Sequence, residues 1–130
     1  MKFWFSGEVM GDVSVEFRSA ILEIEDALNA KVDTGDYGIF ELTHISIIRD
    51  IDHPDYCEVK KYSRLKKEAE FRLKIDYLRF QGADPVTQRK LLIESVIRAI
   101  RELPFLKAKG VQCENLERDV ASVANERGWS

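Results

Sequence analysis

Apolar and polar residues alternate along this chain with two different periods, and these periods divide it into strands and helices. Residues 2–9 carry aromatic side chains on both faces of an extended segment, which favours an inner strand covered on each side. From residue 13 to residue 30 the apolar positions fall on one stripe of a helix. Asp12 or Ser14 can begin this helix, because either side-chain oxygen can accept a hydrogen bond from a free N–H of the first turn.

Three further strands are predicted, over residues 39–49, 56–62 and 66–80. Pro54 separates the first from the second, because proline lacks the N–H that a strand ladder needs. In the third strand, apolar residues alternate strictly with charged ones. The apolar residues are Ala69, Phe71, Leu73, Ile75 and Tyr77. One buried face and one wet face are typical of an antiparallel sheet with one exposed side.

Two helices are expected to complete the chain. The first begins at Asp84 and Pro85, a cap residue followed by a proline at the first helical position, and ends before Pro104. The second is closed by Gly128 and has a helical stripe of Cys113, Leu116, Val120 and Val123. The order β-α-β-β-β-α-α predicts an α+β fold in two layers, with a mainly antiparallel sheet of about four strands and helices on one face. We expect a single domain over residues 1–130, since no repeat or linker divides the chain.

Composition and charge narrow the classes of function. The chain has 130 residues, of which 45% are hydrophobic, so it can fill one core. Its formal net charge of -3 lacks the basic field of a nucleic-acid-binding protein. Cys57 and Cys113 form neither a disulfide framework nor a zinc site, which indicates reduced thiols in a cytosolic protein. No apolar run approaches the roughly 20 residues that span a bilayer, so we expect a cytoplasmic protein without membrane contact. No cofactor is expected, since the sequence has no glycine-rich phosphate loop and no nucleotide fingerprint.

The stretch Ser6-Gly7-Glu8, at the end of the first strand, is a candidate for catalysis. A nucleophilic serine needs a base within hydrogen-bond reach, and the nucleophile-elbow motif places glycine on both sides of it. Phe5 precedes Ser6, so that motif is absent. A structural role for Gly7 and Glu8 is therefore favoured. The alternative is a small cytosolic enzyme, a hydrolase or transferase, that uses Ser6, Glu8 and His44.

An acidic loop follows the second strand, and it contains Asp50, Asp52, His53 and Asp55. These side chains are potential metal ligands, but the glycine and the terminal glutamate of a calcium loop are missing, so no metal site is predicted. Pro54 stiffens the loop and Tyr56 flanks it. We interpret the segment as a docking loop for a basic partner, because a stiff loop loses little entropy on binding and tyrosine is a common anchor.

The segment from Lys60 to Lys67 is rich in lysine and arginine and is interleaved with aromatic residues, which offers an RNA-binding interpretation. Glu68 and Glu70 lie beside it, however, and lysines around a hairpin commonly prevent edge-to-edge pairing of sheets. A solvated turn is the better interpretation, and direct nucleic-acid binding is not expected.

Several segments together resemble one known family. They are FWFSGEV, the helix that begins DVSVEFRSAILEIEDALN, the strand YGIFELTHISII, and EAEFRLKIDYLRF followed by RKLLIESVIRAI. These segments resemble the immunity protein 44 family of bacterial polymorphic-toxin and contact-dependent-inhibition systems. The similarity covers residues 2 to about 103, and its motifs are strand and helix patterns without a catalytic signature.

The resemblance implies a binding protein and not an enzyme. Such a protein is the antidote encoded beside a secreted toxin, and it neutralises the toxin by binding its C-terminal domain. Many such toxins are nucleases with basic clefts, so carboxylates are the expected binding groups. We expect Asp50, Asp52, Asp55 and Tyr56 to contact the toxin. The competing surface is the acidic face of the first helix, with Glu16, Glu23 and Asp26.

Overall fold

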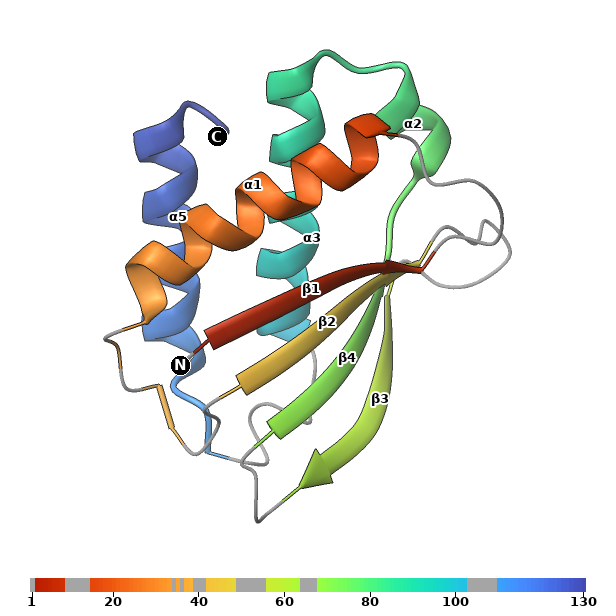
Figure 1. Ribbon diagram of the computed structural model, residues 1–130. Coiled ribbons are helices and arrows are strands. Elements are labelled where there is room, and N and C mark those ends of the chain that lie inside the picture. The colour runs from red at the N-terminus through yellow and green to blue at the C-terminus, as the bar shows by residue number, and fades with distance from the viewer. Residues whose placement is uncertain are drawn as a thin grey trace.

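A computed structural model describes residues 2–8, 15–33, 35, 37–38, 42–48, 56–63, 68–102 and 110–130. Figure 1 shows a sheet with helices gathered on one side of it. The strands are β1 (Lys2–Glu8), β2 (Leu42–Ile48), β3 (Tyr56–Ser63) and β4 (Glu68–Lys74). The helices are α1 (Val15–Val32), α2 (Tyr77–Gln81), α3 (Pro85–Glu102) and α5 (Cys113–Arg127).

The strand order in the sheet is β1-β2-β4-β3, and most of the pairing is parallel. β2 runs parallel to both β1 and β4, and only β3 pairs antiparallel, with β4. The predicted fold, with its mainly antiparallel sheet, is therefore wrong. Helices also hold more of the described residues than strands do. The physical reason is the connection through α1, which carries the chain back so that β2 starts at the same end of the sheet as β1.

β1 lies at the edge of the sheet, so the prediction of an inner strand is also wrong. Phe3 and Phe5 are buried, whereas Trp4 between them is 53% exposed. α1 covers the outer edge of the strand with two polar side chains. The Phe3 N–H donates to Asn29 Oδ1 (2.7 Å), and Asn29 Nδ2 donates back to the Phe3 carbonyl oxygen (2.8 Å). The Phe5 N–H donates to Glu25 Oε2 (2.7 Å), so α1 occupies backbone groups that a free edge would expose.

The predicted strand over residues 66–80 ends early, at Lys74, and a short helix takes up its last four residues, 77–80. Asp76 begins α2, since its side chain accepts a hydrogen bond from the Arg79 N–H (3.1 Å). Gly82 ends the helix, and its N–H donates to the Leu78 carbonyl oxygen (3.2 Å). Tyr77 is therefore a buried residue of α2 and not the last apolar position of a strand.

The long helices follow the predicted stripes. α1 buries Phe17, Ala20, Ile21, Ile24, Ala27, Leu28 and Val32. The predicted helix from Pro85 is confirmed as α3, which ends at Glu102. At the end of α5, Gly128 has a left-handed φ of 75°, which glycine adopts without a steric cost. The Trp129 N–H then donates to the Ala124 carbonyl oxygen (2.7 Å), and the indole is buried.

Besides its buried apolar face, α5 has two side-chain contacts with other described parts of the fold. The Tyr37 hydroxyl, in the segment after α1, donates to the Asp119 carboxylate. On α3, Arg101 forms an ion pair with Glu117, and the Nη2 to Oε1 distance is 2.5 Å. Burial and the hydrogen bond to Asp119 raise the pKa of Tyr37 to about 12. None of the described helices is long and apolar enough to cross a membrane.

Candidate binding surface at the carboxyl edge of the sheet

The three parallel strands end side by side, and we call this end of the sheet the carboxyl edge. Glu8, Ile48 and Lys74 are the last residues of β1, β2 and β4, and they are in register with one another. Figure 1 shows these strand ends converging below α2 and the first turn of α1. Ligands of sheets with parallel strands commonly bind beyond the carboxyl ends of the strands. This edge is therefore the natural place to look for a site.

The described residues on either side of the predicted toxin-binding loop lie at the same edge. Asp50, Asp52 and Asp55 lie outside the described residues, but both flanking residues are placed. Ile48 is the last residue of β2 and is in register with Lys74, and Tyr56 opens β3 opposite Leu73. The loop therefore leaves and re-enters the sheet at the carboxyl edge.

The residues of the alternative enzyme hypothesis lie on two neighbouring strands. The register places Ser6 beside Ser46, and His44 beside Trp4. His44 is thus displaced by two residues from the position directly beside Ser6. Glu8 lies a further two residues along β1, in register with Ile48. The backbone gathers these residues in one half of the sheet without making Ser6 and His44 direct neighbours.

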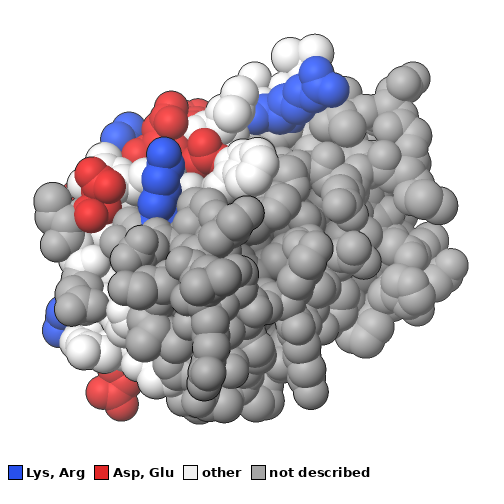
Figure 2. Space-filling model, turned by 60° about the horizontal axis from the view of Figure 1, so that its bottom comes forward, with Lys and Arg blue, Asp and Glu red and all other residues white. Residues whose placement is uncertain are grey.

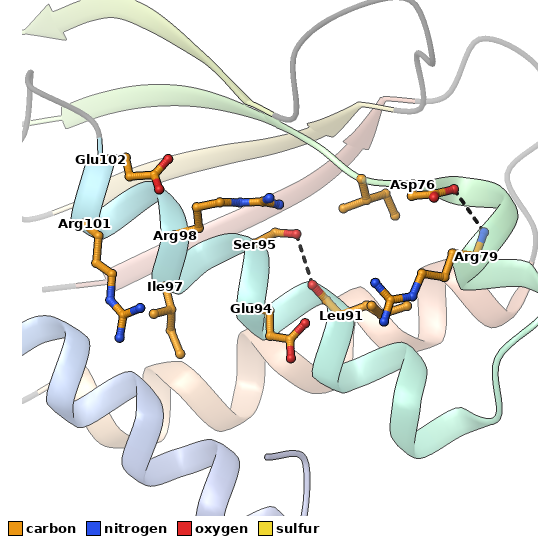
Figure 3. Close-up of a pocket in the computed structure, with 10 residues that line it drawn as sticks. Asp76, Arg79, Leu91, Glu94, Ser95, Ile97, Arg98, Arg101 and Glu102 are labelled. Atoms are coloured by element: carbon orange, nitrogen blue, oxygen red, sulfur yellow. Dashed lines mark hydrogen bonds between the residues drawn. The ribbon is translucent and has the colours of Figure 1, made fainter.

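A groove of about 630 Å³ opens next to the carboxyl edge, between the chain that leaves β4 and one face of α3 (Figure 3). The lining residues of α3 recur every three or four positions, as one helix face requires. They are Leu91, Glu94, Ser95, Ile97, Arg98, Arg101 and Glu102, and Ile75, Asp76 and Arg79 line the other side. The groove could not be predicted from the sequence, because one of its walls depends on the helix α2, a segment predicted to be strand.

The helix α2 is held rigidly against the core beside this groove. Tyr77 and Phe80 are buried, and the Phe80 ring meets the Phe17 ring edge to face, with 5.2 Å between the centroids. The buried Gln88 of α3 donates from Nε2 to the Phe80 carbonyl oxygen (3.1 Å). Leu78, between the two buried aromatic residues, is 71% exposed. α2 therefore presents its outer side chains from a fixed base.

The charged groups of the groove differ in whether they have partners. Arg101 is paired with Glu117 on α5, which raises its pKa through a hydrogen bond and charge attraction. Arg98 reaches from α3 toward the side of the groove where Asp76 lies (Figure 3). Among the described residues, no carboxylate forms an ion pair with the guanidinium of Arg79. Glu94 lies on the opposite wall of the groove, and its side chain likewise has no ion-pair partner among the residues that the structure describes.

The described surface carries charges of both signs. On the face of the molecule drawn in Figure 2, acidic and basic side chains lie next to one another in the described part. A continuous basic stripe, which phosphate backbones require, is not present on that part of it. Within the described ranges, no group of three or more His, Cys, Asp or Glu side chains could hold a metal ion.

A rigid apolar and charged surface, beside a groove on a small domain, is typical of a protein that binds another protein. The family model of immunity protein 44 matches residues 1–126 of the chain. The chain therefore belongs to the immunity protein 44 family, which confirms the resemblance in its strand and helix patterns. The family is one of immunity proteins, which implies binding of a cognate toxin. Searches of curated proteins and of solved structures gave no match.

Proposed function

We propose that this protein binds a cognate secreted bacterial toxin domain and neutralises it by occlusion, in the cytoplasm of the cell that produces both. The observation that carries the proposal is the family match over residues 1–126. The toxin belongs to a polymorphic-toxin or contact-dependent-inhibition system and is bound through its C-terminal domain. Occlusion needs a rigid surface that is complementary to the toxin, and the fixed base of α2 supports this part of the proposal.

We further propose that the toxin is a nuclease and that the acidic loop contacts its basic cleft. The formal net charge of -3 favours association with a basic partner. Asp50, Asp52 and Asp55 supply the carboxylates and Tyr56 the anchor. The position of Ile48 and Tyr56 supports this assignment, because it attaches the loop to the edge where α2 also lies.

The proposal is tested by expressing the C-terminal domain of the toxin encoded by the adjoining gene, with and without this protein. We expect growth arrest with the toxin domain alone and normal growth when both are present. The purified proteins are then mixed at increasing ratios while toxin activity is measured. Protection should be complete at one equivalent. Complete inactivation of an excess of toxin by a small amount of this protein would contradict occlusion, because an occluding inhibitor does not turn over.

The loop is tested with an Asp50/Asp52/Asp55→Asn triple variant. Its affinity for the same toxin domain should fall, and the loss should be larger at low than at moderate salt because salt screens charge attraction. If affinity and its salt dependence are both unchanged, the loop is not part of the interface.

A further inference from the structure

We propose that Leu78 and Arg79 of α2 form a second contact with the cognate toxin domain, where they receive an apolar side chain and a neighbouring carboxylate of the toxin. This inference rests on the proposed function, since it names a surface for the same partner. The acidic loop is proposed to contact basic groups of the toxin, whereas this second contact receives an acidic group. We refer to these two residues as the α2 pair.

The first argument is the combination of exposure and rigidity. Leu78 is 71% exposed, although the residues on either side of the α2 pair, Tyr77 and Phe80, are 2% and 1% exposed. The backbone between them is fixed by the Asp76 cap and by the hydrogen bond from Gln88. A large apolar group on a fixed backbone loses little conformational entropy when a partner covers it, so little of the binding free energy is spent on ordering it.

The second argument is charge. Arg79 lines the groove, and among the described carboxylates none pairs with its guanidinium. A guanidinium presents several N–H donors in one plane, a geometry that matches a carboxylate. Figure 3 shows the Arg79 side chain extending along the groove toward Leu91, so an acidic side chain that enters the groove meets it there. The required partner chemistry is therefore a carboxylate next to an apolar residue.

The third argument is position. The α2 pair begins four residues after Lys74, the end of β4, and Lys74 is in register with Ile48, the last residue of β2 before the acidic loop. A toxin surface that contacts the loop at the carboxyl edge is therefore close to α2. Leu22 is similarly exposed at 58%, but it lies in the middle of α1. It serves as a matched control for an exposed leucine away from this edge.

The test measures the affinity of the purified toxin C-terminal domain for four variants. Leu78→Asp and Arg79→Glu change the α2 pair. Leu22→Asp and Lys31→Glu make the same chemical changes on α1, where Lys31 lies in the last turn, at the opposite end of the sheet. We expect each α2 variant to weaken binding by at least about tenfold, and each control to change it by less than about twofold. Far-ultraviolet circular dichroism establishes that each variant is folded, and Leu78→Ala replaces Leu78→Asp if the latter unfolds.

The outcomes separate this inference from the proposed function. If the wild-type protein binds the toxin domain and the α2 variants bind equally well, the α2 contact is refuted and the proposed function stands. If the controls weaken binding as much as the α2 variants do, the α2 contact is refuted as well. If the wild-type protein does not bind the toxin domain at all, the proposed function fails, and this inference fails with it. Higher salt should reduce the effect of Arg79→Glu and leave that of Leu78→Ala unchanged, because only the former is electrostatic.

Discussion

Replacing Asn29 with alanine is expected to destabilise the protein, because one side chain satisfies two backbone groups of the edge strand. Asn29 accepts from the Phe3 N–H at 2.7 Å and donates to the Phe3 carbonyl oxygen at 2.8 Å, both in partly buried positions. Alanine leaves both groups without a protein partner. It also opens the edge of β1, which becomes available to another chain.

The expected magnitude follows from two opposing terms. A hydrogen bond contributes a net 0.5–1.5 kcal/mol as a rough range, so the loss of two costs about 1–3 kcal/mol. Alanine is the better helix former in α1 and returns up to about 0.7 kcal/mol. The hydrogen-bond term is the larger, so the free energy of unfolding should fall by about 0.3–2.3 kcal/mol. Asn29→Asp should also destabilise, because a carboxylate oxygen then faces the Phe3 carbonyl where an N–H donated.

The assay is urea unfolding followed by circular dichroism, with light scattering to detect association of the folded variant. Asn125→Ala is the matched control, since Asn125 is an exposed residue of α5 and this change alters helix propensity alone. We expect the control to be as stable as the wild-type protein or slightly more so. If Asn29→Ala and Asn125→Ala shift the unfolding free energy equally, the closure of the β1 edge by α1 contributes nothing and the reasoning is refuted.

Three further predictions concern the core, the pH dependence and the first strand. Phe17→Ala should reduce the free energy of unfolding by about 3–5 kcal/mol in urea unfolding, because the fully buried ring packs on Phe80. Burial and the hydrogen bond to Asp119 raise the pKa of Tyr37 from 10.0 to about 12. The contribution of the protonated Tyr37 hydroxyl to the free energy of unfolding should therefore be fully present below pH 10 and be lost as the pH rises toward 12. When thermal unfolding is measured over this pH range, the Tyr37→Phe variant should lack the loss of stability between pH 10 and pH 12. Ser6→Ala and Glu8→Gln should keep full protection in the co-expression assay, and its loss in a folded variant would support a direct role.

The three long helices could be predicted from the sequence because their signals are local. A stripe of apolar residues at helical spacing predicts α1, α3 and α5, while Pro85 marks the start of α3 and Gly128 the end of α5. The parallel direction of β1 and β2 is set by the long connection through α1, and the residue pattern within either strand does not reveal it. The position of β1 at the edge was missed for a related reason. Aromatic residues on both faces indicate burial, yet Trp4 is 53% exposed and a neighbouring helix closes the edge.

The surface around α2 was missed because two periods join without a visible break. Apolar and charged residues still alternate across Ile75 and Tyr77, so the period of a strand appears to continue. The buried positions separate the two periods: Ile75 and Tyr77 are two residues apart, as in a strand, whereas Tyr77 and Phe80 are three apart, as in a helix. This change of period turns Leu78 away from the core and carries Arg79 to the groove. The exposure of the α2 pair that we assign to toxin contact thus depends on where the strand ends. The cap residue Asp76 marks that end, whereas the alternation of apolar and charged residues continues past it.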